Sequence, residues 1–125
     1  MNALKKPAIP TEMRVELLKK ATRHISGIEV VAHSDLVTEF AEKHYVQFLI
    51  RGVRSLKDFE SELSLAAINK ELFYRPLDTV FLPTDPKYAH ISSSLVRELA
   101  LFKRRHRGVM PSSIEDEVYD YLIKY

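Results

Sequence analysis

The chain has 125 residues, a length that suits one domain with a single hydrophobic core. Its net charge of +2 is too small to indicate nucleic-acid binding, and the absence of cysteine excludes disulfides and thiolate chemistry. The sequence has no apolar run as long as a membrane span and no signal-peptide pattern in residues 1–10, so we expect a cytoplasmic protein.

The first third of the chain predicts two helices and a strand. Residues 1–10 form an irregular basic segment, after which Thr11 caps a first helix. The β-branched run at residues 28–32 predicts a short strand. Ser34 then caps a second helix, whose apolar residues face the core.

The middle of the chain predicts a strand, a helix and another strand. The apolar run Val46–Ile50 is a buried strand, and Asp78–Leu82 is a third strand that ends at Pro83. The helix between them, at about residues 57–73, is apolar on more than one face, so we expect it to be well buried.

Two further helices complete the pattern, one from Ser92–Ser94 to about Phe102 and one from Pro111–Ser113 onward. Helices that alternate with short apolar strands indicate a parallel sheet with right-handed crossovers. The predicted class is therefore α/β, with a Rossmann-like parallel sheet and flanking helices.

Arg51 and Arg54 flank Gly52 where the central strand is predicted to end. Open α/β sheets bind anions at the carboxyl ends of their strands, and the planar arginine fork suits phosphate. In the alternative interpretation both arginines are surface residues that pair with Asp58 or Glu60. The residues alone leave both interpretations open.

Ser92, Ser93 and Ser94 precede the apolar start of the fourth helix. Serine hydroxyls and free N–H groups at a helix start can bind an anion. Simple N-capping is the alternative, but it needs only one serine. Three serines in a row therefore favour a phosphate site.

The run Lys103–Arg107 is the densest cluster of charge in the sequence. A solvated surface is one interpretation and a contact with a phosphate backbone is the other. No aromatic residue is interleaved to stack on bases, which weakens a nucleic-acid role. The five histidines are not spaced as metal ligands, so we predict no metal site in the protein itself.

Three blocks of sequence belong together: Lys5–Pro7 with Arg14–Leu17, Ile50–Arg54 with Asp58–Glu60, Glu62 and Asn69, and Ile91–Glu98. In this order and with these gaps they resemble bacterial phosphopantetheine adenylyltransferases over nearly the whole chain. The resemblance implies one nucleotidyltransferase-type domain over residues 1–125, the C-terminal portion of that fold. It also implies adenylyl transfer from ATP to 4′-phosphopantetheine, which yields dephospho-coenzyme A and pyrophosphate in coenzyme A synthesis.

The resemblance also implies roles for individual residues. Lys5 and Arg51 would hold the acceptor phosphate at the reacting centre. Leu36, Val37 and Asn69 would line the pantetheine arm. The ATP side would comprise Gly52, Arg54, Asp58, Glu62, Ile91, Ser92, Ser93 and Ser94. Mg²⁺ would accompany ATP, coenzyme A could bind as a feedback ligand, and a homohexamer is implied, with no nucleic acid or membrane as partner.

The family also begins with a strand and a Thr/His-x-Gly-His motif that do not occur in this sequence, where no histidine follows a glycine. We therefore expect these residues alone not to form the family's continuous sheet, because its first two strands lie mid-sheet. Met1 would then be an internal methionine or the start of a truncated form. The alternative function is a non-catalytic remnant that binds nucleotide or coenzyme A, or a partner subunit. A nucleic-acid module that uses Lys103–Arg107 is a weaker alternative.

Overall fold

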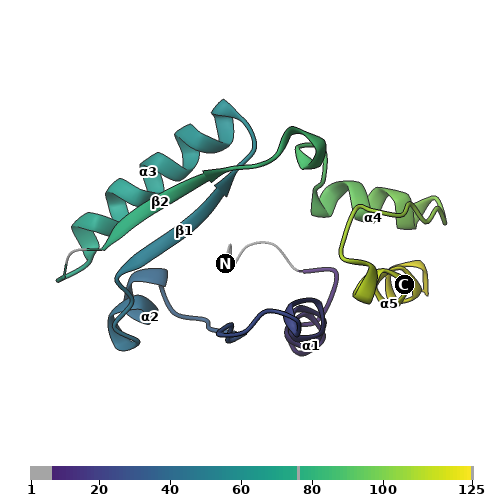
Figure 1. Cartoon of the computed structure of the whole chain (residues 1–125), viewed down its shortest axis with the longest axis horizontal. Coiled ribbons are helices and arrows are strands. Elements are labelled where there is room, and N and C mark those ends of the chain that lie inside the picture. The colour runs from purple at the N-terminus through teal and green to yellow at the C-terminus, as the bar shows by residue number, and fades with distance from the viewer. Residues whose placement is uncertain (1–6, 76, 125) are drawn as a thin grey trace. The chain divides into compact units, whose positions relative to one another are not determined.

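The computed structural model describes residues 7–75 and 77–124. These residues form two compact units, which we describe separately: the described residues between 33 and 90, and those up to 32 together with those from 91 onward. In chain order the elements are α1 (Thr11–Thr22), α2 (Val37–Lys43), β1 (Phe48–Val53), α3 (Leu56–Leu72), β2 (Asp78–Pro83), a short 3-10 helix (Pro86–Tyr88), α4 (Ser93–Leu101) and α5 (Ser112–Lys124) (Figure 1).

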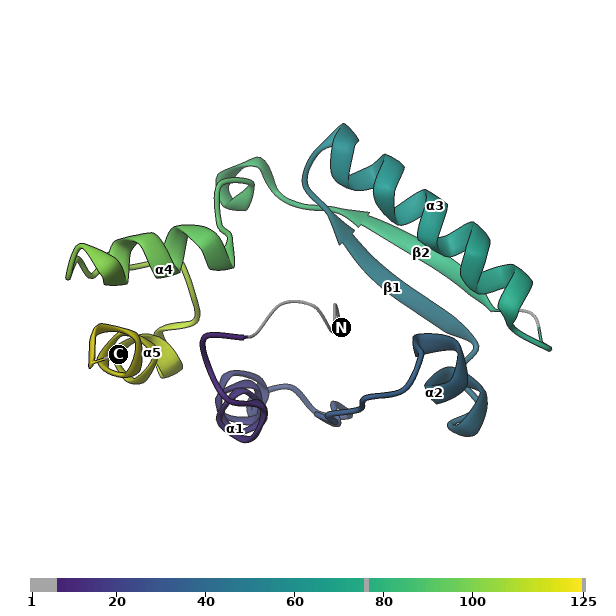
Figure 2. The ribbon, with the colours of Figure 1, turned by 180° about the vertical axis from the view of Figure 1, so that it is seen from behind.

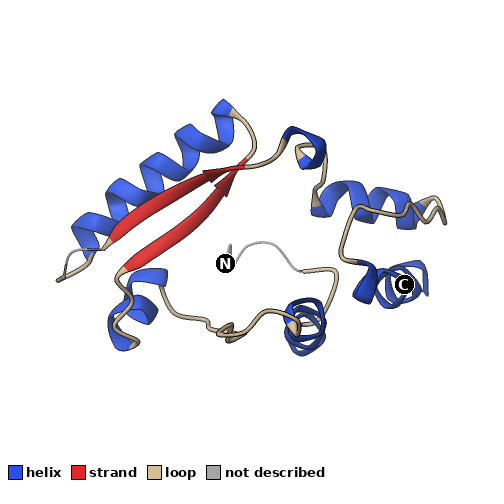
Figure 3. Cartoon of the chain, viewed as in Figure 1, coloured by secondary structure: helices blue, strands red, loops and turns tan. Residues whose placement is uncertain are grey.

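The unit at residues 33–90 is built around the parallel pair β1 and β2, which α3 connects (Figure 3). The ladder runs from Phe48 opposite Asp78 to Val53 opposite Pro83. Both views of the ribbon show α3 lying along one face of the two strands (Figures 1 and 2). The chain is therefore α/β with a parallel two-stranded sheet flanked by helices, which confirms the predicted class.

Local chemistry fixes where α3 begins. Ser55 is its N-cap, and the Ser55 hydroxyl accepts a hydrogen bond of 3.1 Å from the Asp58 backbone N–H. An edge-to-face contact between Phe59 and Phe81, with ring centroids 5.2 Å apart, then holds the helix against the sheet. A small cluster of Ala41, Phe73 and Leu77 closes the opposite end of the unit.

The expectation that α3 is well buried is wrong. None of its residues is buried, and apolar side chains such as Leu63 and Ile68 are about half exposed. The sheet face away from α3 is also open, since Ile50 and Val80 lie opposite each other there and are both exposed. A helix that is apolar on several faces needs neighbours on each of them, and in the described part of this unit the sheet covers only one.

Three predicted boundaries are corrected. Residues 28–32 form no strand, since the described sheet contains only β1 and β2 and a strand needs a hydrogen-bonded partner. Ser34 does not cap α2, which begins at Val37 after the N-cap Leu36. The central strand continues through Arg51 and Gly52 to Val53, because its backbone pairing with β2 extends beyond the end of the apolar run at Ile50.

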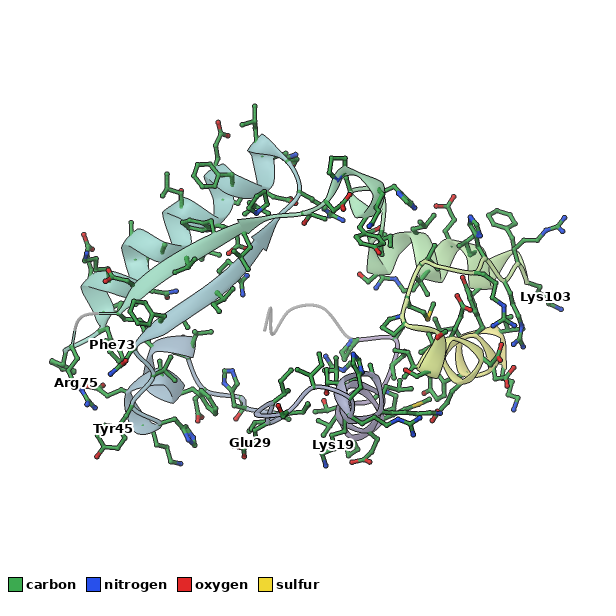
Figure 4. All side chains as sticks on the ribbon, in the orientation of Figure 1. Lys19, Glu29, Tyr45, Phe73, Arg75 and Lys103 are labelled. Atoms are coloured by element: carbon green, nitrogen blue, oxygen red, sulfur yellow. The ribbon has the colours of Figure 1, made fainter. Side chains whose placement is uncertain are left out.

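Helix ends in the same unit are fixed by charged and aromatic side chains. Tyr45 follows α2 with a left-handed φ of 54°, and the Arg75 guanidinium lies 4.7 Å from its ring centroid (Figure 4). Arg75 also donates a hydrogen bond to the Glu42 carbonyl. These contacts tie the end of α2 to the segment that leads into β2.

The second unit is helical, with α5 packed against both α1 and α4. Its core contains Ala100, Val109 and the fully buried Tyr119. The Tyr119 hydroxyl accepts a hydrogen bond from the His106 N–H and donates one to the His106 carbonyl, at 3.2 and 3.3 Å. Tyr119 thereby fixes the loop that joins α4 to α5. No helix among the described residues is long and apolar enough to cross a membrane.

Candidate active site

The strongest candidate site lies where β1 ends and α3 begins. Four charged residues meet there, and we call them the β1 arginine cluster: Arg51, Arg54, Asp58 and Glu62. The carboxyl end of a parallel strand is where α/β folds bind ligands. The cluster therefore stands where the sequence predicts an anion site.

Arg51 and Glu62 form a two-pronged ion pair. The Arg51 Nε donates to the Glu62 Oε2 at 2.6 Å, and the Arg51 Nη2 donates to Oε1 at 2.7 Å. The Glu62 side chain is 20% exposed and that of Arg51 is 49% exposed. Two parallel bonds between planar groups fix the guanidinium in orientation as well as in position.

The ion pair shifts the pKa of both of its members in the direction that favours the charged form. The hydrogen bond from Arg51 lowers the pKa of Glu62, against an opposing effect of burial and of the nearby Asp58 charge. The hydrogen bond to Glu62 raises the pKa of Arg51 in turn. Both groups therefore stay charged throughout the physiological range.

Arg54 forms the second pair, with its Nε 3.0 Å from the Asp58 Oδ2. Asp58 and Glu62 are four residues apart on α3, so both carboxylates lie on the same helix face. The pairing of Arg54 with Asp58 agrees with the surface interpretation of the sequence. Arg51 pairs with Glu62, which the sequence interpretation did not name as a partner, because the helix face that meets β1 continues from Asp58 to Glu62.

A polar cavity of about 390 Å³ adjoins the cluster. Two of its lining residues, Ser61 and Thr84, were not among the predicted site residues. Thr84 follows β2 as Arg54 follows β1, and its N–H donates to the Val53 carbonyl at 2.8 Å. The sequence did contain a signal for Thr84, because this residue directly follows its predicted strand just as Arg54 follows the neighbouring one. The cavity is lined by Gly52, Arg54, Asp58, Ser61, Glu62 and Thr84.

The serine motif lies in the other unit, at the start of α4. Ser92 is the N-cap, and its hydroxyl accepts from the Leu95 N–H at 3.1 Å. The Ser94 hydroxyl accepts from Arg97 at 3.2 Å. Ser92 alone thus explains capping, and the phosphate interpretation of the triplet stays a prediction.

Ser93 opens onto a separate, mostly apolar cavity of about 360 Å³ within this unit. Its walls come from the segment before α1, from α4 and from α5, and they include the cations Arg14 and Arg97. Arg14 also donates to the Thr11 hydroxyl at 2.9 Å. The cavity combines an apolar body with a charged margin.

Three of the remaining predicted residues, Leu36, Val37 and Asn69, belong to the same unit as the β1 arginine cluster but lie at other positions in it. Leu36 is the exposed N-cap of α2, and Val37 begins that helix. Asn69 lies eleven residues beyond Asp58 on α3, about 16 Å along the helix axis. Ile91 is half-buried just before the serines. Lys5 lies outside the described residues.

The basic run contains a second group of paired charges, which we call the α5 arginine cluster: Arg105, Arg107, Glu115, Asp116 and Asp120. Arg105 contacts Asp116 and Asp120. Arg107 bonds to Glu115 at 3.0 Å, and the Gly108 N–H also donates to Glu115. Gly108 has a φ of 83°, which favours glycine there. These contacts offset the charge of both arginines within the fold.

Within residues 7–75 and 77–124, no group of three or more histidine, aspartate and glutamate side chains could hold a metal ion. A magnesium ion in a nucleotide site is often bound largely by the substrate's phosphates and by water.

Comparison with known proteins identifies the family to which this chain belongs. The Cytidylyltransferase-like family model matches residues 1–99. The phosphopantetheine adenylyltransferase of Crocosphaera subtropica is 37% identical over 120 residues, which covers 96% of this chain and 76% of that protein. That of Symbiobacterium thermophilum is 39% identical over 110 residues, with 88% and 67% covered.

A third relative gives the same result. The phosphopantetheine adenylyltransferase of Haemophilus influenzae is 39% identical over 118 residues, covering 94% of this chain and 72% of that protein. These matches include both the β1 arginine cluster and the serine motif. The chain is a nucleotidyltransferase of the cytidylyltransferase-like group and belongs to the phosphopantetheine adenylyltransferase family.

Proposed function

We propose that this chain transfers the adenylyl group of ATP to 4′-phosphopantetheine, a step of coenzyme A synthesis. A phosphate oxygen of 4′-phosphopantetheine attacks the α-phosphorus of ATP in line. The bond from that phosphorus to the bridging oxygen breaks, so dephospho-coenzyme A forms and pyrophosphate leaves. The step uses no covalent enzyme intermediate, so catalysis consists of positioning and charge stabilisation.

The observation that supports this function best is the fixed fork of Arg51. Its Nε and one Nη2 proton are engaged by Glu62, and the structure records no other partner for it within residues 7–75 and 77–124. A guanidinium has five donors, so three are left to bind an anion. Such an oriented cation at a strand end suits the dianionic phosphate of the acceptor.

The proposed roles follow the family motifs residue by residue. Arg51 and Lys5 hold the attacking phosphate. The pantetheine arm lies along Leu36, Val37 and Asn69. The ATP-side residues are Gly52, Arg54, Asp58, Glu62, Ile91, Ser92, Ser93 and Ser94.

Magnesium would enter with ATP and would neutralise charge on the leaving pyrophosphate. We propose that one domain spanning residues 1–125 carries out this work in the cytoplasm, as a homohexamer with coenzyme A as a feedback ligand. The exposed apolar side chains of α3 and of the open sheet face support self-association.

Pyrophosphate release tests the function directly. The chain is mixed with ATP, 4′-phosphopantetheine and Mg²⁺, and release is measured with each substrate omitted in turn. Release that needs both substrates is the expected result. The absence of release would contradict the proposal. ATP binding without release would favour the alternative of a non-catalytic nucleotide-binding protein.

A further inference from the structure

We infer that the mostly apolar cavity beside Ser93 is a binding site for a small amphipathic anion, a ligand with an apolar body and one carboxylate or sulfonate group. The cavity has a volume of about 360 Å³ and shares no described lining residue with the polar cavity of the β1 arginine cluster. The site is therefore additional to the one proposed for 4′-phosphopantetheine at Arg51.

The apolar core of the helical unit forms the floor of this cavity. Three of the lining residues also pack against the core cluster of the unit: Val96, Met110 and Leu122. Val118, which lines the cavity from α5, is itself buried. A floor made of packed core residues keeps its shape, and a mostly apolar pocket of this size is typical of small-molecule sites.

The margin of the cavity carries positive charge. Arg14 lies in the first turn of α1 and Arg97 lies one turn into α4, and the described lining contains no carboxylate. The N-terminal ends of both helices, which bear a partial positive charge, also border the cavity, through Ile9 before α1 and Ser93 in α4. An anionic group on the ligand is therefore favoured over a neutral or a cationic one.

Arg97 is the group that we expect to bind the anion. Its Nη2 donates to the Ser94 hydroxyl at 3.2 Å, in an exposed contact with a neutral group. A guanidinium has five donors, and a charged acceptor bonds to it more strongly than a hydroxyl does. Ser93, Val96 and Arg97 stand at positions i, i+3 and i+4, so one face of α4 presents the hydroxyl, an apolar wall and the cation. This arrangement matches a ligand with its anionic group at one end of an apolar body.

Ser93 connects this cavity with the proposed ATP site. It lines the cavity and also belongs to the serine triplet that we propose for ATP. Two anions held at adjacent positions repel each other, so a ligand in the cavity should weaken the binding of ATP. This consequence, unlike the site itself, rests on the proposed function.

Isothermal titration calorimetry with octanoate and with 1-octanol tests the site. Octanoate carries the anionic group, and 1-octanol has a chain of the same length without a charge. We expect saturable one-to-one binding of octanoate, about tenfold tighter than that of 1-octanol, from the hydrogen bond between charged groups. Equal affinity for both compounds would overturn the assignment of the ligand as an anion. The absence of saturable octanoate binding would overturn the site.

Two variants locate the binding in this cavity. Arg97→Gln removes the charge, so octanoate should bind about tenfold more weakly and 1-octanol should bind unchanged. Arg104→Gln is the matched control, because Arg104 is exposed in the same unit and does not line the cavity. Ala8→Phe puts a large apolar side chain into the cavity from an exposed position before α1, and should abolish the binding of both compounds. Octanoate binding that is unchanged in either variant would overturn the assignment.

Kinetics test the effect on ATP separately. In the pyrophosphate assay, octanoate at its dissociation constant should raise KM for ATP up to about twofold and leave kcat unchanged. Arg97→Gln should largely remove this effect. An unchanged KM for ATP would overturn the link through Ser93, whereas the calorimetry decides the site. If the protein releases no pyrophosphate, the proposed function fails, and saturable octanoate binding that depends on Arg97 still supports the site.

Discussion

The β1 and α5 arginine clusters have nearly the same composition but contrasting environments. In each, two arginines meet acidic side chains of a following helix. In the α5 cluster the central acid, Glu115, is only 3% exposed, and it also accepts a backbone N–H. In the β1 cluster the corresponding acid, Glu62, is 20% exposed and lines an open polar cavity.

The difference in exposure of the two acids shows how similar ion pairs can have different roles. A buried carboxylate that satisfies the backbone has to keep its partners, because an uncompensated buried charge is costly. A carboxylate at the margin of a cavity can orient an arginine that keeps other donors for an anion. We therefore regard the α5 cluster as structural and the β1 cluster as functional.

Replacing the buried acid should give the largest effect on stability. Glu115→Ala removes the partner of Arg107 and leaves the Gly108 N–H without its acceptor, so we expect a loss of about 2–3 kcal/mol in the free energy of unfolding. Urea denaturation measures the change. Glu117→Ala is the control, because Glu117 pairs with Lys20 at an exposed site and should cost below about 1 kcal/mol. Equal losses in the two variants would show that the burial of Glu115 has no effect on stability, and the structural assignment of the α5 cluster would then fail.

Removing the proposed anion ligand should affect activity and spare the fold. Arg51→Ala should reduce kcat/KM for 4′-phosphopantetheine about 30-fold, which corresponds to about 2 kcal/mol for a charge-assisted contact. The midpoint of urea unfolding should change little, since both partners of this pair are accessible to solvent. Unchanged kinetics would exclude Arg51 from the mechanism.

The Arg51–Glu62 pair should also give a small dependence of stability on acid. Because the folded protein lowers the pKa of Glu62, the pair's contribution is fully present above the ordinary glutamate pKa of about 4.3. It is lost as the pH falls below that value through the folded pKa. Solvent screening keeps the effect below about 1 kcal/mol. The free energy of unfolding is measured between pH 3 and 6 for the unmodified protein and for Glu62→Gln. The difference between the two slopes against pH gives the contribution of the pair.

The smallest effect is expected for Arg105→Ala. Arg105 and its partners Asp116 and Asp120 are all well exposed, so the cost should be about 0.5 kcal/mol. Pyrophosphate release should keep its unmodified rate. A loss of activity would show that the basic run contributes to catalysis, and the structural assignment of the α5 cluster would fail.

The sequence predicted what depends on local chemistry. The parallel order of β1, α3 and β2 followed from alternating patterns, and the start of α4 followed from the capping capacity of Ser92. Asp58, which pairs with Arg54, was one of the two acids that the sequence offered as partners of the arginines. Such features are set by residues a few positions apart, where spacing and propensity are informative.

The sequence did not predict what depends on distant neighbours. The apolar faces of α3 suggested burial, but burial is decided by which elements pack there, and the described sheet covers one face. The partner of Arg51, Glu62, was not among the acids offered, because which acid of α3 faces β1 depends on how the helix is rotated against the strand. Residues 28–32 have strand propensity but no strand beside them in the described sheet.

The parallel ladder has a consequence for how this unit folds. Every pair from Phe48 and Asp78 to Val53 and Pro83 is separated by the same thirty residues, so no short-range pair exists to start the ladder. Forming the first pair closes a loop of about thirty residues and costs conformational entropy, whereas each later pair adds little to that cost. We expect β1 and β2 to form in one late event, after α3 has shortened the intervening chain, so that their amide protons exchange with solvent together.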